Sequence, residues 1–198
     1  MEVMAAEQDR FYALIWPLAD VVLRTARVLC ARASDAEDLA QETLMKAFRA
    51  LDQFHPGTDA RAWLLTILRR SHIDRLRQQK SRGQTSSLEA MELDVAAPEA
   101  CPEPLDPAAW HDPAAMLARF GDEQIISAMR QLPESMAWSL LLVDVEELEL
   151  TDAAELMEVP VGTVKSRLHR ARAALRAILE HERKKAEHHE PSKSHHSR

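Results

Sequence analysis

The sequence predicts an all-α protein of two small helical units joined by a flexible acidic linker. Only 4 of its 198 residues are glycine, and the helix-forming residues Ala, Leu, Glu and Arg are abundant. Apolar residues recur at helical spacing in two stretches, and this periodicity stops in a proline-containing acidic stretch between them. We therefore expect units at residues 9–81 and 114–182, a linker at 82–113 and a disordered tail at 183–198.

The first unit contains several helical patterns. Residues 11–30 are helical in pattern, and Pro17 either begins that helix or kinks it. A capping box at Ser34–Glu37 predicts the start of a second helix, whose apolar stripe reaches Leu51. His55-Pro56-Gly57 then breaks the chain. A further helix is expected from Arg61 to about Lys80, with these residues facing inward: Trp63, Leu64, Ile67 and Leu68.

The second unit predicts short helices, tight joins and a long last helix, which is typical of a helix-turn-helix module. The expected helices are Asp122–Leu132, Ser135–Val145, Thr151–Met157 and Val161–Glu182.

The charge is distributed unevenly along the chain. The net charge of −7 alone argues against binding to a polyanion. However, Arg61–Arg82 holds seven basic and one acidic residue, and Pro160–Lys185 holds eight basic and two acidic residues. Ser86–Glu123, which lies between them, holds nine acidic and one basic residue. Two basic patches separated by an acidic tether favour contact with nucleic acid at two places.

The last helix has the two faces that a DNA-reading helix needs. Taking Val164 as the centre of its buried face places Leu168, Ala171 and Leu175 on the same side. Small, hydrogen-bonding and cationic side chains lie opposite or beside this face, and they suit the major groove. The candidate DNA contacts are Thr163, Lys165, Ser166, Arg167, His169, Arg170 and Arg176. A solvated basic helix and a membrane-surface helix are the alternatives.

The basic helix of the first unit supplies a second set of candidates. Trp63 either stacks on an unpaired base or belongs to the core, and its spacing favours the core. Six basic side chains are candidates for contact with the nucleic-acid backbone: Arg69, Arg70, His72, Arg75, Arg77 and Lys80. On the preceding helix, Asp38, Gln41 and Glu42 form a polar face that is either solvated or docks on another protein.

Other classes of function find no support in the sequence. No apolar run approaches the length of a membrane span, and the first residues do not resemble a signal peptide, so we expect a cytoplasmic protein. Cys30 and Cys101 lack metal-ligand spacing, and no phosphate-binding loop or nucleophile constellation is present. We therefore expect no metal, no cofactor and no catalytic activity.

These motifs resemble those of a known family, the sigma factors of bacterial RNA polymerase. Residues 35–43 (DAEDLAQET), 62–68 (AWLLTIL) and 73–77 (IDRLR) resemble region two, while 132–134 (LPE) and 160–172 (PVGTVKSRLHRAR) resemble region four. The order of the motifs and the short chain resemble the extracytoplasmic-function group. The sequence departs from the family pattern at Arg70, where asparagine is common, and at Glu147 and Glu158, where glycines are usual. If Glu158 must adopt a positive φ, this costs on the order of 1 kcal/mol.

The resemblance implies a mechanism. Asp38, Gln41 and Glu42 would bind the clamp coiled coil of the β′ subunit, and region four would bind the β flap. The basic helix of region two, with the loop before it, would read and open the −10 element, and the last helix would read the −35 element. The resemblance also implies an anti-sigma factor as a partner and a stress or envelope-signal regulon. A stand-alone operator-binding regulator is the rival hypothesis, and an enzyme is a third.

Overall fold

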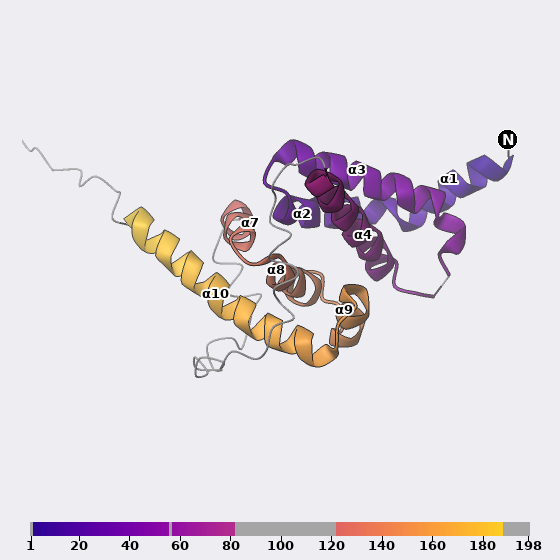
Figure 1. Cartoon of the computed structure of the whole chain (residues 1–198). Coiled ribbons are helices and arrows are strands. Elements are labelled where there is room, and N and C mark those ends of the chain that lie inside the picture. The colour runs from indigo at the N-terminus through magenta and orange to yellow at the C-terminus, as the bar shows by residue number, and fades with distance from the viewer. Residues whose placement is uncertain (1, 56, 82–121, 188–198) are drawn as a thin grey trace, which may run out of the picture.

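The computed structural model describes residues 2–55, 57–81 and 122–187, and the regular structure within these ranges is helical (Figure 1). The expected linker at 82–113 and the tail beyond residue 187 lie outside the described residues. In the N-terminal unit, two short 3-10 turns, Trp16–Leu18 and Leu51–Gln53, follow α1 and α3. Its longer helices are α1 Glu2–Leu14, α2 Ala19–Leu29, α3 Ala33–Arg49 and α4 Ala60–Ser81.

The C-terminal unit has the helix-turn-helix arrangement that its sequence predicts. Helix α8 continues into a π-helical turn, η5, at Leu141–Val145. The last helix runs to Glu187, five residues past its expected end, and is the long diagonal helix of Figure 1. The other helices of this unit are α7 Asp122–Arg130, α8 Glu134–Leu140 and α9 Leu150–Met157, and the last helix is α10 Val161–Glu187.

Local features of the N-terminal unit explain where its helices begin. Pro17 lies in the first turn of the 3-10 segment between α1 and α2, where a missing N–H does no harm. The predicted capping box is wrong, because α3 begins at Ala33 and its N-cap residue makes no side-chain cap bond. Instead, the guanidinium of Arg32 donates to both carboxylate oxygens of Asp35, at 2.9 and 3.0 Å. This pair holds the first turn of the helix, with Ser34 inside it.

The two unusual glutamates adopt the left-handed conformation that the family pattern requires. The φ angles are 56° for Glu147 and 58° for Glu158. Glu158 ends α9, and its backbone N–H donates to the carbonyl of Glu155 at 3.1 Å. The helix-turn-helix geometry therefore forms despite the strain, on the order of 1 kcal/mol, that a side chain carries there.

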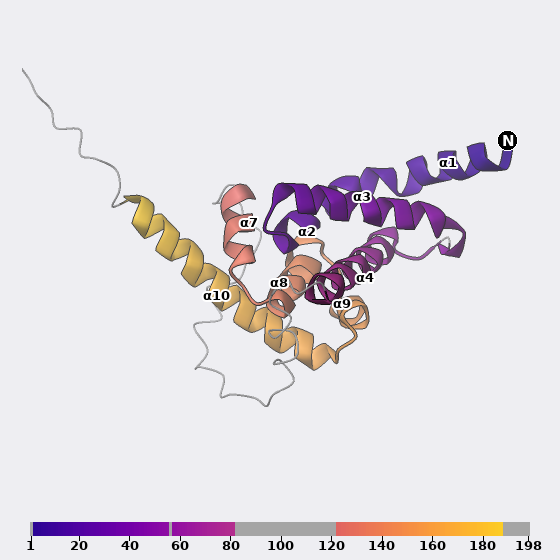
Figure 2. The same cartoon turned by 45° about the horizontal axis from the view of Figure 1, so that its top comes forward.

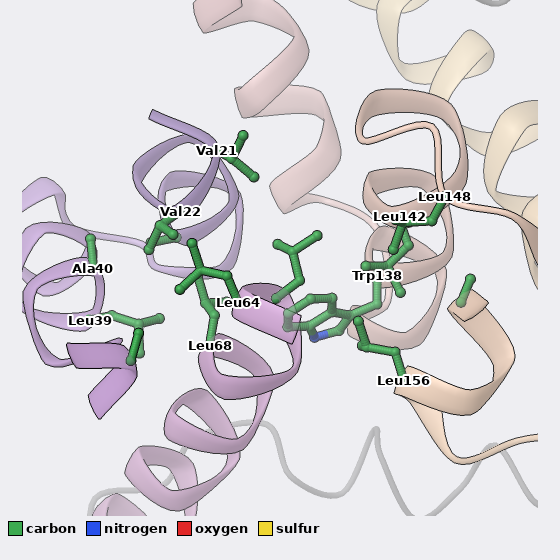
Figure 3. Packing of buried hydrophobic residues seen from close by; sticks show 14 of the residues in the cluster. Val21, Val22, Leu39, Ala40, Leu64, Leu68, Trp138, Leu142, Leu148 and Leu156 are labelled. Carbon is green, nitrogen blue, oxygen red and sulfur yellow. The ribbon is translucent and has the colours of Figure 1, made fainter. Parts of the chain in front are cut away.

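The two units share one hydrophobic core rather than standing apart. Val22 of α2 and Leu64 and Leu68 of α4 pack in the same buried cluster as Trp138 of α8 and Leu156 of α9 (Figure 3). Figure 2 shows α9 beside α4, in agreement with their contacts. The sequence predicted a flexible acidic linker between the units, and the spacing of residues within each helix does not reveal that the units pack together. A polar tether sets only the maximum separation of two units, whereas apolar residues left over on their surfaces favour packing.

Candidate nucleic-acid interface

Helix α10 presents the two faces that the helical wheel predicts. Val164, Leu168, Ala171 and Leu175 are buried. They hold the helix against the rest of its unit, mainly α8 and α9. On the opposite side four polar side chains are exposed to solvent: Lys165, Ser166, His169 and Arg170. The apolar back fixes the helix, and the exposed front is available to a ligand such as the major groove of DNA.

The exposed front of α10 is partly ordered by its own backbone. The hydroxyl of Ser166 donates to the carbonyl of Thr163 at 2.9 Å, and Nε of Arg170 lies 3.5 Å from the carbonyl of Ser166. Both contacts are local and exposed, so either side chain can exchange them for a base edge or a phosphate at small cost. Thr163 and Arg176 are half-buried at the edges of this front.

Two further arginines of α10 face the protein. The guanidinium of Arg172 donates to both oxygens of Asp144, with Nε at 2.9 Å from Oδ2. This hydrogen bond raises the pKa of Arg172, so its guanidinium stays charged at neutral pH. Arg167, a candidate DNA contact from sequence, is only 9% exposed in the structure. The structure therefore leaves Arg167 off the exposed front of α10.

Some of the DNA contacts predicted on α4 are exposed to solvent, whereas others contact the rest of the protein. Arg70 and Arg77 are exposed. Nη2 of Arg69 donates to the carbonyl of Met157 at 3.2 Å, and burial lowers the pKa of this arginine. Trp63 is half-buried, with its ring centroid 5.2 Å from that of Phe54. His72 is buried and therefore not available to DNA in this structure. The side chain of Lys80 lies outside the described residues.

Arg75, the remaining candidate on α4, is held by α3. Its Nε donates to Oε2 of Glu42 at 2.8 Å, and its Nη1 donates to the carbonyl of Asp35 at 3.2 Å. Lys46 also pairs with Glu42, at 2.8 Å. Burial alone would raise the pKa of Glu42, but the hydrogen bonds from Lys46 and Arg75 outweigh it and lower that pKa. Glu42 therefore braces α3 against α4.

Beside the polar face of α3 lies an apolar groove that the sequence analysis missed. Asp38 and Gln41 are exposed, and Gln41 also lines this groove of about 650 Å³. Trp16, Met45 and Phe48, which are 54%, 48% and 38% exposed, supply much of its surface. The spacing of Gln41, Met45 and Phe48 places all three on one face of α3, and this is the sequence signal for the groove.

Within the described ranges, no group of His, Cys, Asp and Glu side chains could hold a metal ion, and no helix is long and apolar enough to cross a membrane.

Comparisons with known proteins decide which family this arrangement represents. Residues 14–82 match the model of Sigma-70 region 2, and residues 122–175 match that of Sigma-70, region 4. The chain is 31% identical over 151 residues to the ECF RNA polymerase sigma factor EcfG of Rhodopseudomonas palustris, covering 76% of this chain and 75% of that relative. The chain belongs to the extracytoplasmic-function sigma factors. Sigma factors are DNA-binding transcription-initiation factors rather than enzymes.

Other sigma factors extend the likeness. SigW of Bacillus subtilis is 27% identical over 90% of this chain and 93% of its own length. SigE of Mycolicibacterium smegmatis is 34% identical over 81% of this chain, and the match spans 58% of that relative.

Solved structures support the same fold. The sigma factor RpoE of Bartonella quintana, solved in complex with the anti-sigma factor NepR, has a TM-score of 0.58 and 29% identity, covering 85% of this chain and 98% of its own. In this sigma factor, region 2 thus contains the basic helix α4, and region 4 contains the exposed front of α10.

Proposed function

We propose that this sigma factor directs core RNA polymerase to promoters by placing α10 on the −35 element and α4 on the −10 element. The observation that carries the proposal is the exposed front of α10, Lys165, Ser166, His169 and Arg170, above a buried apolar back. Within a region 4 match, such a helix is suited to the major groove, where Arg can donate two hydrogen bonds to guanine.

For the −10 element, Arg70 and Arg77 are the candidates that the structure leaves exposed on α4. We propose that both contact the sugar-phosphate backbone, because long cationic side chains on one helix suit this role. Trp63 lies at the start of the same helix and is half-buried, so part of its ring remains available for stacking on an unpaired base. Arg69 joins this set only after its contact with Met157 breaks.

We further propose that core polymerase binds α3 through Asp38, Gln41 and the adjoining apolar groove. An exposed polar edge next to exposed Met45 and Phe48 combines the apolar centre and polar rim typical of protein interfaces. The structure ties Glu42 to Arg75 and Lys46, so we assign it a bracing role rather than a direct contact.

An anti-sigma factor is a proposed partner as well, supported by the likeness to RpoE of Bartonella quintana in its complex with NepR. Co-purification of the chain with the product of a neighbouring gene would test this partner. A stress or envelope-signal regulon remains part of the same proposal.

Run-off transcription with purified core polymerase tests the proposed function. We expect the wild-type chain to bind core and to start transcription at a promoter that core alone does not use. Arg170→Ala should weaken initiation, whereas Arg27→Ala, which removes an exposed arginine of α2, should not. If the wild type forms no complex with core, the proposal is wrong. Tight, dimeric binding to duplex DNA without polymerase would instead favour a stand-alone regulator.

A further inference from the structure

A buried carboxylate joins the two regions of this sigma factor. Glu146 lies in the turn between η5 and α9, and its side chain is fully buried. Arg24 of α2 donates to Oε1 of Glu146 through Nη2 at 2.7 Å and through Nε at 3.2 Å. Arg61 of α4 donates to the backbone carbonyl of Glu146 at 2.9 Å, and its Nη1 lies 4.0 Å from Oε2. Both cations that approach this region 4 carboxylate therefore come from region 2.

The contacts of Glu146 with Arg24 and Arg61, here called the Glu146 clamp, are accompanied by other contacts between the two regions. Nε2 of His72 in region 2 lies 3.2 Å from Oε1 of Glu134 in region 4. Nε of Arg130 in region 4 donates to the carbonyl of Arg27 in region 2 at 2.8 Å. Trp138, only 2% exposed, packs in the apolar cluster that both regions share (Figure 3). The two regions thus form one body, joined by ion pairs and by the shared apolar cluster.

This packing conflicts with simultaneous reading of two promoter elements. Centres at −35 and −10 are separated by about 25 base pairs, or about 85 Å of duplex at 3.4 Å for each base pair. Helix α4 has 22 residues and α10 has 27, so they are about 33 and 40 Å long. Region 4 packs directly on α4, with Arg69 bonded to Met157. Two reading helices of this length in one packed body do not reach both elements.

We propose that the Glu146 clamp holds the sigma factor, when it is away from polymerase, in a closed state that must open before both elements are read. The role of opening in promoter recognition rests on the proposed function. The closed state itself is inferred from the contacts between the two regions alone. Opening separates Glu146 from Arg24 and Arg61, and it releases Arg61 and Arg69 on the promoter-reading helix. Core polymerase stabilises the open state because it binds that state more tightly.

The closed state lowers the apparent affinity for any partner that needs the open one. The apparent dissociation constant is the intrinsic constant divided by the open fraction. If nine-tenths of the molecules are closed, complete opening strengthens apparent core binding about tenfold.

Small-angle X-ray scattering of the full chain without DNA or polymerase tests the closed state. Glu146→Gln keeps the shape of the side chain but removes its charge, and Arg24→Gln removes the other half of the pair from a different region. Both variants should increase the radius of gyration and give a pair-distance distribution with two maxima. Because the two residues act through one contact, the double variant should open little further than Glu146→Gln. Far-UV circular dichroism should show unchanged helix content.

Glu147→Gln is the matched control, because it makes the same change of side chain at the adjacent residue, which is exposed to solvent. It should scatter like the wild type. The proposal is overturned if the wild type is already extended, if neither clamp variant opens, or if Glu146→Gln opens while Arg24→Gln does not. A titration with core polymerase should then show up to about tenfold tighter binding by the clamp variants. If no variant binds core but the scattering differs as expected, the proposed function fails and the closed state stands.

Discussion

Arg75 on α4 donates a hydrogen bond at 2.8 Å to Glu42 on α3, which joins two residues that the sequence had assigned to different partners. The sequence placed Arg75 on DNA and Glu42 on polymerase. In the structure each is the other's partner, and Lys46 completes the group. These contacts make the pair a brace inside region 2.

Replacing Glu42 should therefore cost stability. We expect Glu42→Gln to lower the free energy of unfolding by about 1 kcal/mol, because a partly buried ion pair with two donors is lost. Urea denaturation measures this change. Asp38→Asn, on the exposed side of the same helix, is the control and should leave the midpoint unchanged. The bracing role would be contradicted if both changes had equal, small effects on stability and only Glu42→Gln lost binding to core polymerase.

The same group predicts how stability depends on pH. The pKa of Glu42 is lowered in the folded chain, so the unfolded chain binds a proton more readily. The contribution of Glu42 is fully present above its unfolded pKa of about 4.3 and is lost as the pH falls through the folded pKa. The difference in unfolding free energy between the wild type and Glu42→Gln should therefore shrink below about pH 4. A difference that grows with acidity would contradict this assignment.

Arg170 and Arg172 lie two residues apart on α10 but should behave differently. Arg172→Ala leaves the carboxylate of Asp144, which is 3% exposed, without its bidentate partner, and should lower the free energy of unfolding by about 3 kcal/mol. Arg170→Ala should leave the thermal midpoint unchanged and weaken −35-dependent initiation, by about 1–3 kcal/mol if this arginine reads a base. Thermal denaturation and run-off transcription, applied to both variants, separate the two roles. If both variants lose stability equally, Arg170 stabilises the fold rather than contacting DNA.

Glu158 offers a stabilising substitution. Its φ of 58° is strained for a side chain, so Glu158→Gly should raise the free energy of unfolding by about 1 kcal/mol. Glu149→Gly is the control: this exposed residue has a φ of −61°, and glycine there should bring no gain. Chemical denaturation of both variants measures the difference. A loss of stability in Glu158→Gly would mean that its side chain makes a contact worth more than the strain.

The sequence alone determined the features that depend on the spacing of residues within one helix. The wheel of α10 separates buried Val164 and Leu168 from exposed Ser166 and Arg170, because 3.6 residues per turn fix which side chains share a face. The family pattern also marked the positions of Glu147 and Glu158, where glycines are usual, and the structure has a positive φ at both.

Only the tertiary structure decided which charged side chains remain available to a ligand. Arg69, Arg75 and Arg172 have the same chemistry as Arg70, Arg77 and Arg170, and periodicity does not reveal a partner on another helix. Met157, Glu42 and Asp144 lie 88, 33 and 28 residues away from them along the chain. The apolar groove and the Glu146 clamp arise in the same way, because each is assembled from helices that meet only when the chain folds.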